Sequence, residues 1–430
     1  MAMHARMRMM ALVLALVAMI APGLVAPAQP VSAAQPSGEV LLWTGFTAGG
    51  EKAGIEAMIA AFQEQNPDIT INHRPIGNEQ FFTVIRTGLA GGEPPDVLQF
   101  EGYQQARDFA AAGQLTDLTE WWAERSENFA MPESGAQACT YEGKVYCVPM
   151  TYSTGWQIYY NPEILEANGI EVPTTYEEFL AAAETLKAAG ITPIALGAKD
   201  GWPSSHWYMA FLVQRCGVET VYQAIDGEGA SFTDECFVQA AADLQNLAQL
   251  GYLSPGVASD DYGTGQALFL AGRAAFFQTG SWFASGWEQT PPKFDVGIMP
   301  FPRISDAANS TDVTGAVTHV LAIPTGADNP EAAMAVLDWM ASEEAANIWA
   351  ANGNISMYNG AVEASAPPVI QELWAAAGAG ERALPWIENE LPPGVGEDKV
   401  YTGTVALLNG SMTPEEFSQS VQDALVAASS

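Results

Sequence analysis

Residues 40–71 read VLLWTGFTAGGEKAGIEAMIAAFQEQNPDITI. The first four residues form an apolar run of strand length, and a glycine-rich loop follows over residues 45–50. Apolar residues then recur at helical spacing over residues 55–62, and the Asn-Pro pair at 66–67 ends this pattern. Isoleucine alternates with a polar residue over 69–71, which is typical of a strand. The stretch therefore predicts a strand, a helix and a second strand in succession.

The same alternation continues along the chain. A helix is predicted from Phe81 to Leu89 and another after the Thr174/Glu177 pair, which has the spacing of a capping box. One long helix is predicted from Asn329-Pro330 to Ala351, and a last one from Thr413. The predicted strands lie between such helices, at residues 96–100, 157–160, 194–196, 274–278 and 319–323. This order predicts an α/β protein with mainly parallel sheets.

Length and composition indicate a globular protein of two domains. The chain has 430 residues, 48% of them hydrophobic and 15% charged. Sixteen basic and 50 acidic residues give a net charge of −34. Such an acidic surface repels nucleic acid and anionic lipid, so we expect no nucleic-acid partner.

The first 34 residues have the pattern of a secretory signal peptide. Arg6 and Arg8 precede an apolar run over residues 10–20, and small residues follow at Ser32, Ala33 and Ala34. The run is too short to span a bilayer, although a membrane anchor stays open as an alternative. We expect cleavage near Ala33 or Ala34, which leaves 14 basic and 50 acidic residues and a charge of −36. No cysteine lies near this point, so no lipid anchor is expected.

Four cysteines permit three disulfide pairings: Cys139, Cys147, Cys216 and Cys236. Cys139 and Cys147 flank a predicted hairpin that turns at Glu142–Gly143, and this arrangement places their sulfur atoms opposite each other. We therefore prefer the pairs 139–147 and 216–236, with four free buried thiols as the alternative. Scattered histidines and the absence of a C-x-x-C pair predict no metal site.

Loops at the predicted strand ends combine an aromatic residue with small polar or acidic residues. Ligands of open α/β sheets bind beyond the carboxyl ends of the strands. Five loops show this combination: Trp43–Thr47, Glu101–Tyr103, Thr151–Trp156, Gly201–Trp207 and Gly280–Trp282. An aromatic ring can cover the apolar face of a pyranose, and carboxylates and amides can bind its hydroxyl groups. The loops therefore predict a sugar site, with Trp282 and Glu101 as its first candidates.

Other roles for these residues stay open. Trp43 can simply pack in the core, since aromatic residues are usually buried. Glu101 can serve only as a cap of the helix that starts near Gln104, without a ligand contact. For His206, a structural hydrogen bond and a ligand contact are equally compatible with the sequence.

The segment Leu42-Trp43-Thr44, with the helix that ends at Phe62 and Asn66-Pro67, is followed in order by Gly92–Val97, Ala112–Leu118, Gly143–Pro149, Tyr159-Tyr160-Asn161, Pro173–Phe179 and Gly280-Ser281-Trp282. In this order and spacing, these segments resemble the family 1 extracellular solute-binding proteins of ABC importers, the group of the maltose- and aldose-binding proteins. The resemblance covers nearly the whole chain after the signal peptide, and the loop 201–207 is most similar to monosaccharide binders. The segment Asn354–Met357 departs from the family because it lacks a basic residue that is often found there.

The resemblance implies a two-lobe periplasmic-binding-protein fold of type II, in which each lobe is a mainly parallel sheet flanked by helices and the chain crosses the hinge several times. The implied division is 1–34 for the signal peptide, 38–151 for the first part of lobe 1, 152–313 for lobe 2, 314–360 for the return to lobe 1, and 361–428 for C-terminal helices of lobe 2. The implied ligand contacts are Trp43, Thr44, Glu51, Glu101, Tyr152, Ser153, Trp156, Trp202, His206, Trp282, Thr314 and Gly315.

The function implied by the resemblance is capture of a sugar and its delivery to the permease of an ABC transporter. We therefore expect a monomer outside the cytoplasm, in the periplasm or secreted, with no enzymatic activity and no cofactor. Two rival functions stay open. An exported glycoside hydrolase needs only two well-placed carboxylates, although the motifs G-x-S-x-G and H-E-x-x-H are both absent. A polyamine or another cation would also suit a site of acids and aromatic rings.

Overall fold

The computed structural model describes residues 36–155, 157–287, 291–304, 313–377, 383–392 and 394–428. The predicted signal peptide lies outside these residues, and so does Trp156, one of the expected ligand contacts. Pro36–Ser430 form one compact unit, in which the described strands make two larger sheets and a short hairpin. No helix among the described residues is both long and apolar enough to cross a membrane.

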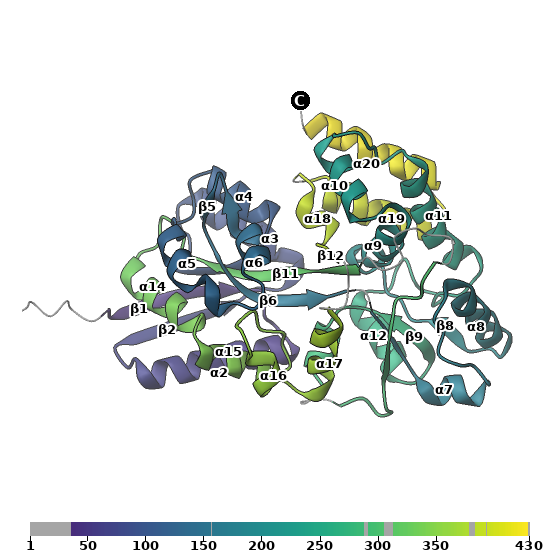
Figure 1. Ribbon diagram of the computed structural model, residues 1–430, viewed down its shortest axis with the longest axis horizontal. Coiled ribbons are helices and arrows are strands. Elements are labelled where there is room, and N and C mark those ends of the chain that lie inside the picture. The colour runs from purple at the N-terminus through teal and green to yellow at the C-terminus, as the bar shows by residue number, and fades with distance from the viewer. Residues whose placement is uncertain are drawn as a thin grey trace, which may run out of the picture. The chain divides into compact units, whose positions relative to one another are not determined.

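The first sheet has six strands, in the order β12-β11-β3-β1-β2 with β6 also paired to β11. Strands β2, β1 and β3 are parallel, whereas β11 runs antiparallel to β3 and to β6. Figure 1 shows β11 next to β6. The strands are β1 (Gly38–Thr44), β2 (Ile69–Pro75), β3 (Val97–Glu101), β6 (Val148–Thr154), β11 (Val313–Ala322) and β12 (Ala383–Leu384).

Helices of the expected amphipathic type cover this sheet. On α2, the predicted apolar face is buried, since Ile55, Met58 and Phe62 are at most 1% exposed. The helices that accompany the first sheet are α2 (Gly49–Gln65), α3 (Asn78–Gly91), α4 (Gln104–Ala111), α5 (Thr119–Arg125), α6 (Pro132–Cys139), α14 (Pro330–Met340), α15 (Glu343–Ala351), α16 (Ala361–Ser365) and α17 (Pro368–Ala377), with the short helix η1 (Ser126–Asn128).

The second sheet has the strand order β10-β7-β9-β8. Only β8 and β9 pair in parallel, whereas β7 is antiparallel to both β9 and β10. The expectation of a mainly parallel sheet is therefore wrong for this half. The reason is that β7 enters this sheet directly from β6 of the first sheet, and its direction is set by its pairing with β9 and β10, which come much later in the chain. The strands are β7 (Gln157–Tyr160), β8 (Thr192–Ile194), β9 (Ala274–Gln278) and β10 (Gly297–Pro300).

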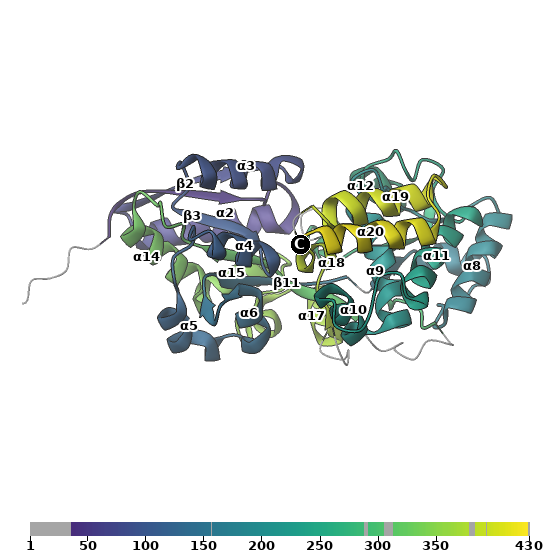
Figure 2. The ribbon, with the colours of Figure 1, turned by 90° about the horizontal axis from the view of Figure 1, so that it is seen from above.

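A second, larger set of helices accompanies this sheet. Figure 2 shows α19 and α20 side by side, and both also contact α11. The helices are α7 (Pro162–Ala167), α8 (Tyr176–Ala188), α9 (Trp202–Cys216), α10 (Val218–Asp226), α11 (Glu235–Gln249), α12 (Tyr262–Leu270), α13 (Trp282–Ser285), α18 (Ile387–Glu390), α19 (Thr402–Leu408) and α20 (Pro414–Ala428), with the π-helical turn η2 (Gly396–Tyr401). The division of the chain into lobes at residues 151, 313 and 360 stays a prediction.

Two helix boundaries differ from the sequence prediction. The capping box is formed by Thr175 and Glu178, one residue later than expected, because Thr174 uses its hydroxyl group to bind the same Glu178 carboxylate. The long helix predicted up to Ala351 is two helices, α14 and α15. Ser342 adopts an extended conformation and its side chain accepts a bond from the Ala345 amide, so it caps a new helix.

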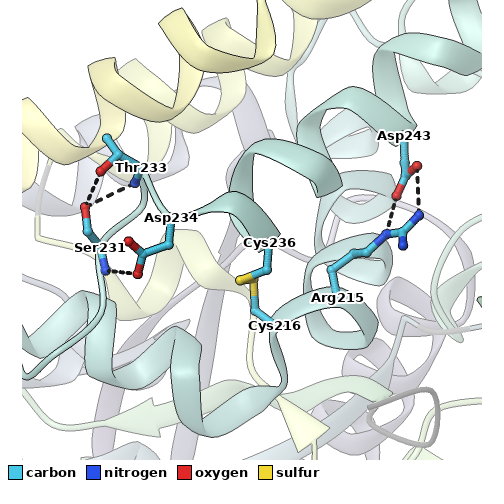
Figure 3. Close-up of a disulfide and its surroundings, with 7 residues drawn as sticks. All are labelled: Arg215, Cys216, Ser231, Thr233, Asp234, Cys236 and Asp243. Carbon is cyan, nitrogen blue, oxygen red and sulfur yellow. Dashed lines mark hydrogen bonds and ion pairs between the residues drawn. A yellow bond between two sulfur atoms is a disulfide. The ribbon is translucent and has the colours of Figure 1, made fainter. Parts of the chain in front are cut away.

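The structure contains the two disulfides preferred from the sequence. Cys139 and Cys147 are joined across the hairpin β4 (Thr140–Tyr141) and β5 (Lys144–Val145), whose turn residues Glu142 and Gly143 both have positive φ. Cys216 and Cys236 join the end of α9 to the start of α11, and Arg215 binds Asp243 with two nitrogen atoms beside this bond (Figure 3). The C-terminal end of α9 is therefore fixed by a covalent and an ionic link.

Candidate functional site

An aromatic cluster forms around the N-terminal end of α9. The ring of Trp202 lies 5.8 Å from that of Trp282 and 4.6 Å from that of Tyr262, measured between centroids. One turn later on α9, His206 stacks on Trp386 at 4.5 Å. Trp202, Trp282 and Tyr262 are partly exposed, whereas His206 and Trp386 are buried. Three expected contacts, Trp202, His206 and Trp282, therefore meet in one place.

The polar atoms of this cluster are held by a buried carboxylate. Glu388 accepts a hydrogen bond from the Tyr401 hydroxyl group at 2.9 Å, and its Oε1 lies 3.6 Å from Nε2 of His206. Ser205 donates to the other oxygen at 3.4 Å. Burial and the charge of Glu388 raise the pKa of Tyr401 well above its ordinary value, so this phenol stays a hydrogen-bond donor. The cluster thus combines flat apolar faces with fixed polar groups.

A second group of polar residues comes from the first sheet. Glu101 ends β3 and pairs across the ladder with His319 of β11, while Glu51 lies in the first turn of α2. His319 lies between the two acids, with Nε2 2.9 Å from Glu51 Oε1 and Nδ1 3.3 Å from Glu101 Oε1. Burial alone lowers the pKa of His319, but the charges of Glu101 and Glu51 outweigh it and raise the pKa to about 10. His319 is therefore a cation that bridges two carboxylates at neutral pH.

The two groups lie close enough to interact electrostatically. Burial raises the pKa of Tyr262 to about 12, and the charge of Glu51 contributes to this rise. The charge of Glu101 likewise contributes to the raised pKa of Tyr401. The backbone of Ser285, on the helix that begins at Trp282, also lies against Gly50 next to Glu51. The carboxylates of the first sheet thus lie within electrostatic range of Tyr262 and Tyr401.

Four expected contacts lie on the β6–β11 pair rather than in the ring cluster. Tyr152 is buried, with its ring 5.7 Å from that of Trp374, and its hydroxyl group lies against Gly315. Ser153 shares a hydrogen bond of 2.8 Å with Thr318. Thr314 lies next to Trp386 of the cluster, since both side chains lie against Gly155.

The remaining two expected contacts have structural roles. Trp43 is 5% exposed and its ring packs against Gly88 of α3, so the core alternative describes it better than a ligand contact. Thr44 is fully buried and its hydroxyl group bonds to His73 at 2.8 Å. For Glu101, the bridge to His319 replaces the alternative of a helix cap, since Tyr103 occupies the N-cap position of α4.

Sequence reasoning missed Tyr262, His319, Trp386, Glu388 and Tyr401. The prediction of the site uses the ends of predicted strands, but Trp386 follows a strand of only two residues, β12, and Tyr401 ends a π-helical turn. His319 is the first residue of the predicted apolar strand 319–323, a position that does not mark it as a ligand contact. The feature that identifies His319 as a site residue is its position opposite Glu101, and only the register of β11 against β3 reveals that position. Among the described residues, no three or more His, Cys, Asp or Glu side chains are arranged so that they could hold a metal ion.

Comparison with protein families gives a match over residues 48–347 to the model described as bacterial extracellular solute-binding protein. An uncharacterized ABC transporter extracellular-binding protein of Pyrococcus horikoshii is 30% identical over 321 residues, which cover 72% of this chain and 68% of that protein. The multiple sugar-binding protein of Streptococcus mutans is 26% identical over 58% of this chain and 59% of its own length.

Solved structures with the same fold include a chitin oligosaccharide binding protein, at a TM-score of 0.81 and 24% identity, with 91% of this chain and 99% of that chain covered. The maltose/maltodextrin-binding domain of Bdellovibrio bacteriovorus, bound to maltotriose, matches with a TM-score of 0.74 and 18% identity, covering 91% of this chain and 99% of that chain. These likenesses confirm the fold expected from the sequence, two α/β lobes of the periplasmic-binding-protein type.

Proposed function

Since this chain belongs to the bacterial extracellular solute-binding proteins, we propose that its ligand is a sugar, bound between the ring cluster and the Glu51–His319–Glu101 bridge and delivered to the permease of an ABC transporter. The sugar-binding relative from Streptococcus mutans supports this choice of ligand. The protein acts outside the cytoplasm as a monomer without a lipid anchor. Closure of the lobes around the sugar is the signal that the permease recognises.

The observation that carries the proposal is the pairing of flat rings with fixed carboxylates. Trp202, Trp282 and Tyr262 keep part of their surface exposed and can cover the apolar face of a pyranose. Glu51 and Glu101 each use one oxygen atom to bind His319. The second oxygen atom of each can accept a hydrogen bond from a hydroxyl group of the sugar. Because these bonds involve charged acceptors, they are stronger than bonds between neutral groups.

The histidine cation makes the site less attractive to a polyamine than two free carboxylates would be. A cation would gain from the two carboxylates, but His319 already occupies the space between them and carries a positive charge of its own. The same bridge disfavours hydrolysis, because a glycosidase needs one protonated carboxyl group as acid opposite a second carboxylate. Here both acids are engaged by one histidine cation.

A thermal-shift screen tests the proposal directly. Glucose, xylose, galactose, N-acetylglucosamine and their β- and α-linked oligomers are added at millimolar concentration, with putrescine and spermidine as the competing class. A ligand that binds only the folded state raises the melting temperature. A shift with a saccharide and none with the polyamines is expected. A shift with polyamines alone, or release of monosaccharide from a bound oligomer, would contradict the proposal.

A further inference from the structure

The backbone of Tyr103 is strained. Its φ of 58° and ψ of −118° lie in a region that residues other than glycine rarely adopt. Among the described residues, only Glu142, in the turn of the β4–β5 hairpin, is also a non-glycine residue with positive φ. Tyr103 lies two residues after Glu101, at the N-cap position of α4. Strained residues cluster at ligand-binding sites, where the surrounding contacts hold them in place.

Contacts with α6 hold this strained conformation. The backbone N–H of Tyr103 donates to the carbonyl oxygen of Ala138 at 2.6 Å, and the tyrosine side chain is only 2% exposed. Gly102 permits the close approach, because a β-carbon at this position would lie 3.0 Å from that of Ala138 and 3.1 Å from its carbonyl oxygen. The next residue, Cys139, ends α6 and is joined to Cys147. The loop after β3 is therefore bound to a segment that a disulfide fixes.

Strand β11 is irregular immediately before His319. From Val317 to His319 this strand advances by two residues, whereas its partner β6 advances by only one. Thr318 is therefore an extra residue, as in a β-bulge. Bulges redirect neighbouring side chains and occur often beside binding sites. Here the neighbouring side chain is His319, which lies opposite Glu101 in the ladder.

The loop after β3 contacts this irregular segment of β11. The backbone N–H of Gly102 donates to the carbonyl oxygen of Thr318 at 3.3 Å. The hydroxyl group of Tyr103 faces the backbone amide of Val317 and the side chain of Ser134. Burial raises the pKa of this hydroxyl group above its ordinary value, so the group stays uncharged at neutral pH. Tyr103 therefore follows one strand of the bridge and contacts the other.

We propose that Tyr103 is a positioning residue for ligand binding, which holds the end of β3 and the irregular segment of β11 together so that Glu101 and His319 form their bridge. This inference rests on the proposed function, in which Glu101 binds the sugar. Because Tyr103 is buried, it acts through these two residues and not by its own contact with the sugar. Its strained conformation is retained because relaxing it would break the contacts with both α6 and β11.

Tyr103→Phe tests the inference, because it removes the hydroxyl group and keeps the ring. Calorimetry measures the affinity for whichever of glucose, xylose, galactose, N-acetylglucosamine and their oligomers raises the melting temperature most. This affinity should fall about fivefold, as expected for the loss of one buried polar contact. NMR titration of the histidine rings should show the pKa of His319 lowered from about 10 toward its ordinary value, since the ring lies less firmly between its acids. The signal of His319 is identified by its absence in His319→Gln.

Tyr208→Phe is the matched control. It removes the hydroxyl group of another buried tyrosine, on α9, whose oxygen atom has no hydrogen-bond partner among the described residues. It should change neither the affinity nor the pKa of His319. Gly102→Ala is a second test that leaves Tyr103 intact, because the added β-carbon forces the loop away from Ala138. It should lower both quantities as Tyr103→Phe does, and it serves if Tyr103→Phe does not fold.

The pKa of His319 separates a positioning role from a purely structural one. A lower melting temperature in Tyr103→Phe, with the affinity and this pKa unchanged, would overturn the inference and leave the proposed function intact. Weaker binding with an unchanged pKa would also overturn it, because Tyr103 would then act by another route. If the wild-type protein binds none of the saccharides, the proposed function fails, whereas the pKa of His319 still decides whether Tyr103 positions the bridge.

Discussion

Glu390 of α18 is a buried acid whose replacement should stabilise the protein. Its side chain is 3% exposed, its nearest cation, Arg107, lies 3.9 Å away, and its Oε1 has no hydrogen-bond partner among the described residues. Burial raises the pKa of Glu390 to about 7, and this effect outweighs the charge of Arg107, which acts in the opposite direction, while Asp226 adds to the rise. Folding therefore favours the protonated form of this residue.

The pKa difference sets the size of the effect. Between an ordinary value of 4.5 and about 7, the difference is roughly 2.5, and each pKa unit is worth about 1.36 kcal/mol. Because the folded-state pKa is raised, this residue favours folding below pH 4.5, and that contribution is lost as the pH rises through 7. The loss is about 3 kcal/mol at pH 8 and less than about 1 kcal/mol at pH 5.

Glu390→Gln keeps the shape and removes the charge, so it should raise the free energy of unfolding by up to about 3 kcal/mol at pH 8 and by little at pH 5. Urea denaturation at the two pH values measures the difference, with the exposed Glu64→Gln as the control that should change nothing. An equal change at both pH values would show that the effect is not ionisation. A less stable variant at pH 8 would show that the ion pair with Arg107 outweighs burial.

Three further outcomes follow from the same contacts. Trp282→Ala should weaken sugar binding by at least about 30-fold in calorimetry, as for a central aromatic anchor, whereas Trp121→Ala, on the distant helix α5, should leave it unchanged. Replacing Cys216 and Cys236 together by serine should lower the free energy of unfolding by about 3 kcal/mol, since the bond closes a loop with a sequence separation of 20, and calorimetry should show a lower Tm. His319→Gln should remove a positive charge that stabilises the wild-type protein fully below pH 6.5 and that is lost as the pH rises to about 10. The melting temperatures of the wild-type protein and of the variant should therefore converge as the pH rises over this range.

Much of the fold follows from local patterns in the sequence. The helix and strands over residues 40–71, and the last helix with its buried Phe417 and Val421, lie where the apolar periodicity predicts them. The antiparallel pairing of β7 could not be predicted, because strand direction within a sheet is decided by contacts between segments far apart in the chain. The break between α14 and α15 coincides with a shift of the buried face, since Val336 and Met340 of the first helix are followed by Ala345 and Trp349 of the second, out of phase with the helical repeat.

The candidate site was predicted in part for the same reason. Trp202, His206 and Trp282 each follow an element that the sequence identifies, and they meet as expected. Trp386 and Tyr401 belong to a segment with no regular period, which includes a two-residue strand and a π-helical turn. Their positions depend on packing against α9, such as the contact of Tyr401 with Gly201, and no local pattern encodes that contact.

The anchoring of α9 suggests how such a site can bind tightly without many contacts. Trp202 and His206 lie at the N-terminal end of this helix, and its C-terminal end is fixed by the Cys216–Cys236 bond and the Arg215–Asp243 pair. His319 fixes the acids of the first sheet in the same way. Side chains that are ordered before binding lose little conformational entropy when the ligand arrives, so more of each contact is retained as affinity. A change that frees the C-terminal end of α9 from these two links should therefore weaken sugar binding, even though it removes no contact with the ligand.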